Sequence, residues 1–355
     1  MNTEDIIALY YENGAEILRE LDLCRGDSDF RKVYIVDDKT KKLVIKHTSN
    51  SFSNGDSIRG WAELADKYNS LGIYCPTTVR NRNGELYSEY TDNGRKYYVY
   101  AEEFAKFPTA ESLGKEKTYD ENGRPYFLSN MMRHLGKVAS AHLDVMDHPS
   151  AYALLVPFDI EDETDEATEC AEKFYRFVCK ELPEHQAEAK RLLDMFYSNK
   201  RELEAVYKDL PTSCFQADLN DTNILVDEDM DFAGLIDFNI SGKEPCINYL
   251  CREALWNVSD SRLYHKDDHH ELYFYDEALD DHRLDLFFDN IGLIAENYCF
   301  TEKEREIFPV LFRYMNSFWW FHVSEIERIK NDSEKIPQLF KWLEKQMTRN
   351  DLRLP

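Results

Sequence analysis

Hydrophobic and polar positions alternate along much of the first hundred residues, as they do in half-buried strands. The segments "RKVYIVDD" and "KKLVIKH" flank the polar turn "DDKT", and "ELYSEY" and "RKYYVYAEEF" flank the turn "TDNG". Each pair predicts a β-hairpin. Helices are predicted over about 3–18, where apolar residues are only loosely periodic, and over about 57–70. This part of the chain therefore predicts a β-rich domain with one internal helix.

The spacing of apolar positions lengthens after Phe107 and Pro108. "LSNMMRHLGKVASAHLDVM" carries a helical stripe, and "DIEDETDEATECAEKFYRFVCKEL" opens with acidic residues that suit a helix N-terminus. Two short apolar segments, "NILV" and "AGLIDF", interrupt this half as strands, and helices return near residue 249. We predict an α+β chain with a β-rich domain over 1–105 and an α-rich domain over 106–355.

The composition describes a folded protein of about two domains: 355 residues, 43% hydrophobic and 31% charged. No run of about 18 apolar residues suggests a membrane span. The first residues, "MNTEDIIALYY", lack the basic start of a signal peptide. The eight cysteines are scattered without a C-x-x-C pair, which favours reduced thiols. We therefore expect a cytoplasmic protein.

The formal net charge is -25 at pH 7. This balance argues against nonspecific nucleic-acid binding, because phosphate backbones require a basic surface. The excess of carboxylates serves solubility or, alternatively, lines a cleft for a cationic substrate.

Three polar residues stand among apolar segments near residue 220. The stretch "CFQADLNDTNILV" holds Asp218 and Asn223. "DLNDTN" matches the D-L-x-x-x-N spacing of a kinase catalytic loop, in which the aspartate accepts the proton of the attacking hydroxyl and the asparagine binds a metal ion. The alternative is an ordinary turn, since this spacing alone is common.

Asp237 ends the apolar strand of "GLIDFN", a setting that matches the aspartate that grips the metal between nucleotide phosphates. Pairing of the strands "NILV" and "AGLI" would place Asn223 beside Asp237. Amide and carboxylate oxygens suit Mg2+. The alternative for Asp237 is a strand-end or helix-cap residue.

The N-terminal half offers partners for the phosphates. "KKLVIKH" resembles the V-A-I-K strand and ends on Lys46, and Glu63 lies in the following helix. We expect Glu63 to orient Lys46 on the α- and β-phosphates. Both residues would otherwise be ordinary solvated side chains.

Two weaker segments complete the nucleotide site. "CRGDSDFRKVYIV" takes the place of a phosphate-covering loop but holds one glycine, Gly26; Ser28 would offer its hydroxyl and N–H, or the segment is a plain hairpin turn. Glu102 and Phe104 lie where an interdomain hinge would offer backbone groups to the base.

Together these residues resemble the aminoglycoside phosphotransferase family, which includes choline and ethanolamine kinases, a type of homoserine kinase, methylthioribose kinase and spore-coat kinase-like proteins. Its usual signature is an H-G-D-x-x-x-x-N loop followed by an I-D-F-x strand end, and the resemblance extends from Gly26 to about Arg252. It implies a bilobal protein-kinase-like fold with a nucleotide-binding first lobe. It also implies ATP or GTP as donor, Mg2+, and a hydroxyl of a small acceptor that is aminoglycoside-, choline- or homoserine-like.

The chain departs from that signature at Gln216, where the family has histidine, at Ala217, where it has glycine, and at Asn248, where many members have aspartate. Because glutamine can donate and accept hydrogen bonds, we expect the first change to alter the support of the loop rather than a reacting group. The alternative function is a kinase-like binding or structural protein of the spore-coat type that has lost turnover.

Two acidic stretches are candidates for the acceptor site, residues 161–169 and 264–281. Carboxylates interleaved with aromatic residues suit an ammonium group through charge and cation–π contacts. The favoured alternative is a pair of solvated acidic faces. His265, His269 and His270 lack a helically spaced third ligand for a metal site, and Trp319 and Trp320 are expected in the core rather than in a ligand cage.

Overall fold

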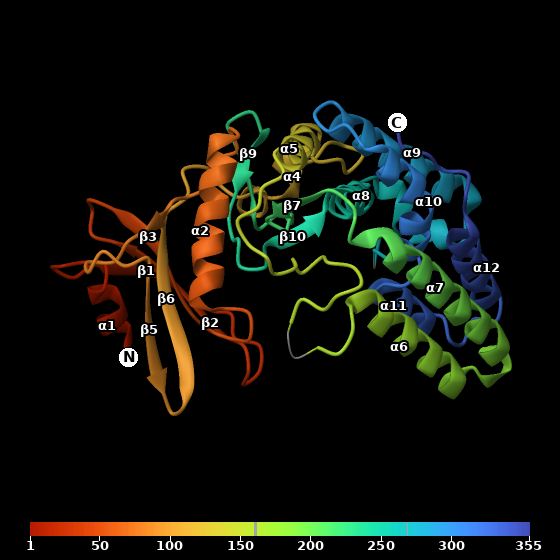
Figure 1. The fold of residues 1–355 in the computed structure, drawn as a ribbon, viewed down its shortest axis with the longest axis horizontal. Helices are drawn as coiled ribbons and strands as arrows, with labels where there is room; N and C mark the ends of the chain where they lie inside the picture. Colours follow the sequence, from red (N-terminus) through yellow and green to blue (C-terminus); the bar gives the residue numbers. More distant parts are fainter. Residues whose placement is uncertain (160–161, 268) are drawn as a thin grey trace.

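The computed structural model of the chain describes residues 1–159, 162–267 and 269–355. Figure 1 shows a β-sheet at the N-terminal end, a largely helical part at the C-terminal end, and α2 beside β9 between them. The expected α+β fold, with a β-rich first part and an α-rich second part, is confirmed. The predicted boundary after residue 105 lies between the end of β6 at Glu103 and the start of α3 at Ala110.

The N-terminal sheet has the order β1-β2-β3-β6-β4, and β5 pairs with β6. Its strands are β1 (Glu16–Asp22), β2 (Phe30–Asp37), β3 (Lys42–Ser49), β4 (Thr78–Val79), β5 (Tyr87–Asp92) and β6 (Arg95–Glu103). All neighbours are antiparallel. Both predicted hairpins are thus confirmed, as the pairs β2–β3 and β5–β6.

Helix α1 (Thr3–Ala8) is much shorter than the predicted helix over 3–18. Its periodic apolar residues continue only to Tyr11, and they pack on one face of the sheet. Gly14, with a φ of +74°, then turns the chain. The apolar Ile17 and Leu18 belong to the edge strand β1, where they are 40% and 47% exposed.

The helix predicted over about 57–70 is confirmed as α2 (Gly55–Ser70), which packs on the opposite face of the sheet with a buried stripe over residues 57–68. The segment after α2 joins the sheet to the C-terminal part, because the main chain of Tyr74 pairs with β9. The Leu235 N–H donates to the carbonyl of Tyr74 at 2.9 Å. A Cβ on Gly234 would lie 1.9 Å from that carbonyl oxygen, so this close approach requires glycine.

The C-terminal part is helical apart from two short two-stranded sheets. Its helices are α3 (Ala110–Leu113), α4 (Lys115–Thr118), α5 (Leu128–Ser140), α6 (Glu166–Glu181), α7 (Gln186–Tyr207), α8 (Cys246–Trp256), α9 (Glu277–Ala295), α10 (Glu302–Met315), α11 (Trp320–Arg328) and α12 (Lys335–Thr348). Three 3-10 turns are η1 (Pro183–His185), η2 (Ser261–Leu263) and η3 (Leu272–Phe274). One hydrophobic core runs from the inner face of α2 through these helices.

The two small sheets hold the functional segments. β8 (Ile224–Val226) pairs with β9 (Phe232–Leu235), as predicted, and β7 (Thr212–Phe215) pairs with β10 (Gly242–Pro245). The second pair escaped prediction because "GKEP" combines glycine, proline and two charges, a poor strand pattern. All eight cysteines are free thiols, as expected. Among the helices of the described residues, none is both long and apolar enough to cross a membrane.

Candidate active site

The loop between β7 and β8 brings Asp218 and Asn223 together. The Nδ2 of Asn223 donates a hydrogen bond of 2.7 Å to Oδ2 of Asp218, and the Nδ2 of Asn220 donates one of 2.7 Å to Oδ1. Ala217 has a φ of +65°, a left-handed conformation that costs an alanine about 1 kcal/mol. The two carboxylate oxygens of the half-buried Asp218 are thus fixed by two amides.

Gln216 is completely buried and joins this loop to the segment that carries Asp237. Its Nε2 donates to the main-chain carbonyls of Ile236 at 2.9 Å and Asp237 at 2.7 Å, and its Oε1 accepts from the N–H of Asp218 at 2.7 Å. Only this orientation of the amide satisfies all three partners, since two are acceptors and one is a donor. Gln216 therefore ties the main chains of the two aspartates together.

Asp237 lies two residues after the end of β9. Like Ala217, it has a left-handed backbone conformation, with a φ of +60°. Lys46 of β3 donates hydrogen bonds of 3.1 Å both to Oδ1 of Asp237 and to Oε1 of Glu102 on β6. In β3, Ile45 packs toward α1, so Lys46 points to the opposite face of the sheet. A cation of the N-terminal sheet thereby meets a carboxylate of the C-terminal part.

The ionisation of these groups is strongly coupled. Burial and the nearby charge of Asp237 raise the pKa of Asp218, although hydrogen bonds from the two amides oppose the rise. Burial by itself would lower the pKa of Lys46, but the carboxylates of Asp237 and Glu102 outweigh it and raise that pKa well above its usual value. Lys46 is therefore held as a cation between two carboxylates.

The predicted ion pair between Lys46 and Glu63 is not formed. Glu63 lies off the buried stripe of α2 and is exposed to solvent. Glu102 takes the place of the partner, because β6 lies beside β3 and presents it on the face that carries Lys46. The helical period could have excluded Glu63, since Trp61 and Leu64 on either side of it point to the core.

Glu102 and Phe104 were predicted to offer backbone groups to the nucleotide base. The Glu102 side chain is engaged with Lys46, and the Phe104 ring, 39% exposed, lies 3.6 Å from the Nζ of Lys42. The Phe104 N–H already donates to the carbonyl of Lys42 at 3.1 Å. Their backbone contact with a base stays a prediction.

Gly26 and Ser28 lie in the exposed turn that joins β1 to β2, where Gly26 has a φ of +68°. Arg95 at the start of β6 donates to the carbonyls of Asp27 at 2.5 Å and Ser28 at 3.1 Å. Arg95 thus anchors the turn to the sheet. This role could not be predicted from the sequence, because an arginine that opens a strand is usually a solvated residue.

The side chains of Asn223 and Asp237 fit a hard divalent cation. Oδ1 of Asn223 receives only a 3.3 Å hydrogen bond from Thr222, and Oδ2 of Asp237 has no partner among the described residues. No group of three His, Cys, Asp or Glu side chains in the described part of the chain could hold a metal alone. A metal here would complete its shell with phosphate oxygens and water, as Mg2+ commonly does.

Helix α8 packs against the loop that carries Asp218. The hydroxyl of Tyr249 accepts a hydrogen bond of 3.3 Å from the N–H of Ala217, and its ring stacks on Phe215 with centroids 4.0 Å apart. Glu253 lies one turn further along the helix and is 1% exposed. Burial raises the pKa of Glu253 to about 8. The loop therefore rests on a helix that carries a buried carboxyl group.

Asn248, also on α8, supports a different segment. Its Nδ2 donates to the carbonyl of Tyr152 at 3.2 Å and to Oε2 of the buried Glu244 at 2.8 Å. Burial raises the pKa of Glu244 to about 7. Neither Asn248 nor Glu244 touches Asp218, so the departure at Asn248 affects the support of the chain before α6.

The two acidic stretches differ in their surroundings. Residues 161 and 268, one in each stretch, lie outside the described residues. In the first stretch, Asp165 is buried, caps α6 and pairs with Lys200 at 2.7 Å, so it has a structural role. In the second, the rings of His265 and His270 stack with centroids 4.7 Å apart. This part of the chain surrounds two cavities.

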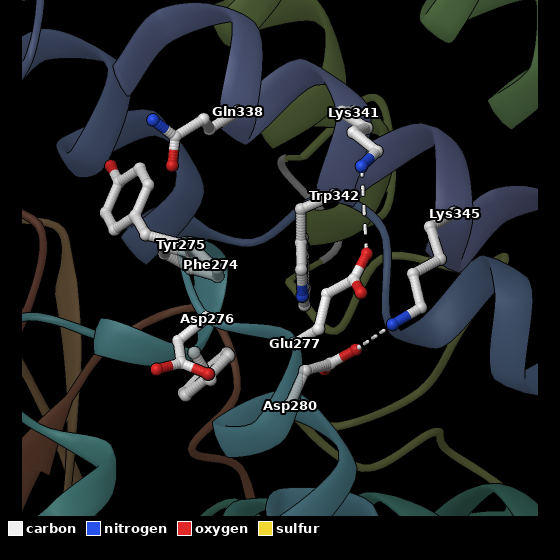
Figure 2. A pocket seen from close by; sticks show the side chains of 10 residues that line it. Phe274, Tyr275, Asp276, Glu277, Asp280, Gln338, Lys341, Trp342 and Lys345 are labelled. Carbon is white, nitrogen blue, oxygen red and sulfur yellow. Dashed lines mark hydrogen bonds and ion pairs between the residues drawn. The ribbon is translucent and has the colours of Figure 1, made fainter. Parts of the chain in front are cut away.

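One of these cavities, of about 100 Å³, lies among η3, α9 and α12 (Figure 2). Two of its acidic side chains point toward lysines of α12: Glu277 pairs with Lys341 at 3.7 Å and Asp280 with Lys345 at 3.1 Å. None of these elements carries a residue of the loop at Asp218. The cavity is therefore separate from the candidate active site.

The other cavity, of about 220 Å³, lies between the C-terminal end of α8, the segment around η3 and the start of α11. Trp319 and Trp320 both line it. Trp319 is buried in the core, as expected, but Trp320 is 59% exposed, so the expectation of a core residue fails for Trp320.

The fold and the site define a phosphotransferase of the protein-kinase-like class: a small sheet carries the lysine, and a helical part carries the aspartates. The sequence pattern of the family described as "Phosphotransferase enzyme family" matches residues 20–247. The chain belongs to this family, and the expectation of a small-molecule kinase with a hydroxyl acceptor is confirmed at this level. No curated protein matches the sequence.

Two solved structures share the fold at low identity. An amicoumacin kinase, solved in complex with AMP-PNP, Ca2+ and Ami, is 13% identical; the match covers 95% of this chain and 89% of that one, with a TM-score of 0.52. A microcompartment-associated aminopropanol kinase is also 13% identical, over 97% and 94% of the two chains, with a TM-score of 0.51. The expected bilobal kinase-like fold is thereby confirmed.

Proposed function

We propose that this protein transfers the γ-phosphoryl group of ATP or GTP to a hydroxyl of a small acceptor. The observation that carries the proposal is that three segments of the chain meet, one with Lys46, one with Asp218 and Asn223, and one with Asp237. Lys46 and Asp237 are in direct contact, and Asn223 binds Asp218. A chain that only needed to fold would gain little from gathering these charges.

Asp218 is the general base of the proposed reaction. The amides of Asn220 and Asn223 fix its carboxylate, which leaves lone pairs to accept the proton of the attacking hydroxyl. Burial and the charge of Asp237 raise its pKa, which makes it a stronger base than a carboxylate in water. Mutations of such bases typically slow a reaction by about 10²–10⁴-fold.

Lys46 neutralises charge on the nucleotide phosphates, and Glu102 orients it. Asn223 and Asp237 would hold Mg2+, which when bound supplies positive charge to the phosphate oxygens. Gly26 and Ser28 cover the phosphates from the turn that Arg95 anchors. The donor is supported by the amicoumacin kinase of similar fold, which was solved with AMP-PNP. The acceptor belongs to the aminoglycoside-, choline- or homoserine-like class.

The intact support at Gln216 favours an enzyme over a kinase-like binding or structural protein. Gln216 meets three hydrogen-bonding demands at once, and Lys46, Asp218, Asn223 and Asp237 all remain. A loop freed from turnover would have no need of such complete support.

Thermal unfolding with nucleotide tests the donor half of this proposal. We expect Mg2+ with a nonhydrolysable ATP analogue to raise the Tm of the wild-type protein by several degrees. The same mixture should have no effect on Asp237→Ala, and nucleotide without Mg2+ should have little effect on either. Stabilisation that is equal in both proteins would overturn the assignment of Asp237.

A further inference from the structure

The register of the N-terminal sheet places Arg25 on the same face as Lys46. Val33 of β2 lies directly opposite Lys46 of β3 and directly opposite Leu21 of β1. Residues directly opposite each other in antiparallel strands share a face, and so do alternate residues of one strand. The ladder continues past the end of β1, because Arg25 and Asp29 form an antiparallel bridge in the same register. Arg25 therefore belongs to the face that carries the candidate active site.

Arg25 and Lys46 lie at different places along this face. Arg25 is four residues beyond Leu21, on the order of 13 Å along the strand at about 3.3 Å per residue. It opens the turn that Ser28 belongs to, which is the segment proposed to cover the phosphates. Arg95 holds this turn on the sheet through the carbonyl of Ser28 at 3.1 Å. The main chain at Arg25 is therefore fixed on both sides, by the bridge and by the anchored turn.

The guanidinium of Arg25 is exposed and has no hydrogen-bond or ion-pair partner among the described residues. Asp29, its neighbour across the bridge, is already engaged. The Nε of Arg31 donates to Oδ1 of Asp29 at 2.9 Å, and the Nδ2 of Asn50 donates to the same oxygen at 3.1 Å. The nearest carboxylate of the turn is thus occupied, and the charge of Arg25 remains available.

Arg25 lies close enough to Asp218 for the two charges to interact. Burial and the charge of Asp237 raise the pKa of the Asp218 carboxyl, and the charge of Arg25 opposes this rise, as the hydrogen bonds from two amides do. Arg25 and Asp218 form no ion pair in the described structure, so their charged groups are not in contact. A cation of the turn therefore faces the proposed base across an open interval.

Arg19 shows that this position is specific to Arg25. Arg19 is also an exposed arginine of β1, and it shares the face of Leu21 because it lies two residues before it. It lies at the other end of the strand from the turn, and it does not affect the pKa of Asp218. The two arginines therefore differ in their distance from the base rather than in their exposure or their face of the sheet.

We propose that Arg25 is a further catalytic residue, whose guanidinium binds the γ-phosphoryl group while this group moves from the nucleotide to the acceptor. The inference rests on the proposed function. The acceptor hydroxyl has to reach Asp218, so the group in transfer passes through the interval between Asp218 and Arg25. Lys46, further back along the same face, remains with the α- and β-phosphates.

In this step the acceptor oxygen forms a bond to the γ-phosphorus, and the bond from that phosphorus to the bridging oxygen of the nucleotide breaks. Asp218 takes the hydroxyl proton, and ADP or GDP leaves with the electron pair. The transition state spreads negative charge over the three outer oxygens of the phosphoryl group. A guanidinium can donate to two of these oxygens at once, which a lysine cannot do in the same geometry. Arg25 would thus stabilise the transition state more than the bound nucleotide.

The test uses ADP with Mg2+ and aluminium fluoride, which imitates the phosphoryl group in transfer and requires no acceptor. Titration calorimetry on the full chain compares the affinity for Mg2+ and ADP with the affinity for the same mixture plus aluminium fluoride, and GDP replaces ADP in a parallel series. For Arg25→Gln we expect the affinity for ADP to stay within about twofold of the wild type. The affinity for the aluminium fluoride mixture should fall by about a hundredfold or more.

Two further variants sharpen this comparison. Arg25→Lys should recover part of the lost affinity for the aluminium fluoride mixture, because it restores the charge without the two-pronged donor. Arg19→Gln is the matched control and should bind both mixtures as the wild type does. The Tm of each variant without nucleotide should equal that of the wild type, since both arginines are exposed.

An Arg25→Gln protein that binds the aluminium fluoride mixture as tightly as the wild type would overturn the inference. So would an equal loss of affinity for ADP and for the aluminium fluoride mixture, because Arg25 would then act only on the bound nucleotide. Both results would leave the proposed function intact. A wild-type protein that gains no affinity from aluminium fluoride would also overturn the inference, and one that binds neither ADP nor GDP with Mg2+ would overturn the proposed function as well.

Discussion

The side-chain amide of Gln216 donates a hydrogen bond of 2.7 Å to the main-chain carbonyl of Asp237. The same side chain accepts from the N–H of Asp218, so one residue spans the proposed base and the proposed metal ligand. The substitution of histidine by glutamine in the family signature therefore retains a connection between the two segments. It alters which side chain makes the connection.

Gln216→Glu tests this connection, because it keeps the size of the side chain but replaces the donor NH2 with an oxygen. That oxygen would face the carbonyls of Ile236 and Asp237, so we expect the affinity for nucleotide with Mg2+ to fall by about tenfold or more. Titration calorimetry measures it. The control Gln338→Glu, on the exposed face of α12, should bind as the wild type does. Unchanged affinity in Gln216→Glu would show that the connection has no functional weight.

Two Glu→Gln substitutions, at Glu102 and at Glu63, test which carboxylate is the partner of Lys46. Glu102→Gln removes a charged hydrogen bond to a buried lysine, and we expect it to lower the free energy of unfolding by about 2 kcal/mol. Glu63→Gln alters an exposed residue and should stay within about 0.5 kcal/mol of the wild type. Urea unfolding of the variants measures both. The reverse order of the two effects would restore Glu63 as the partner.

The close passage of Tyr74 over Gly234 predicts a large loss of stability in Gly234→Ala. The added Cβ would lie 1.9 Å from the main-chain oxygen and 2.7 Å from the carbonyl carbon of Tyr74, and such overpacking costs about 1–3 kcal/mol. Gly292→Ala is the matched control: Gly292 lies in α9 with open space around it, so the variant should gain up to about 1 kcal/mol. Denaturant midpoints compare them, and a harmless Gly234→Ala would contradict the described contact.

Most of the fold could be predicted from its local patterns, as the hairpins β2–β3 and β5–β6 illustrate. The failures have physical causes. The helix over 3–18 was overextended because apolar residues at 17 and 18 imitate a helical stripe but belong to an exposed edge strand. The β7–β10 pair is stabilised by burial in the helical core, which a short polar segment does not announce.

Some residues of the candidate site could likewise be predicted from local patterns, and others could not. Asp218, Asn223 and Asp237 follow from local spacing, because one loop and one hairpin carry all three. The partner of Lys46 depends on which strand lies beside β3, and the role of Arg95 depends on where a distant turn folds back. Such contacts between remote segments leave no trace in the pattern of a single segment.

Glu253 makes stability depend on pH. Burial, more than the opposing Arg252, raises its pKa from 4.5 to about 8, so between these values the folded protein holds a proton that the unfolded chain releases. Its stabilisation is therefore present at low pH and is lost as the pH rises toward 8, at up to about 1.4 kcal/mol per pH unit. Burial lowers the pKa of His47 to about 4, so such a buried histidine stays neutral when the unfolded chain takes up a proton. Its effect is a loss of stability as the pH falls below 6.5, opposite in direction to the effect of Glu253.

The window from pH 7 to 8.5 isolates the carboxyl groups, because a histidine of the unfolded chain, with an ordinary pKa of 6.5, is then mostly neutral. We expect the Tm of the wild type to fall across this window. Glu253→Gln, which resembles the protonated side chain, should show a smaller fall. Parallel curves for the two proteins would contradict the assignment of a proton to Glu253 near neutral pH.

Phosphoryl transfer by wild type and Asp218→Ala tests the central claim most directly. The measurement follows the γ-phosphoryl group of labelled ATP into a panel of aminoglycosides, choline, homoserine and sugars, with nucleotide binding recorded in parallel. The account predicts transfer to at least one hydroxyl acceptor by the wild type, a loss of at least about 10²-fold in Asp218→Ala, and nearly unchanged binding of nucleotide with Mg2+. Transfer by Asp218→Ala at the wild-type rate would contradict it.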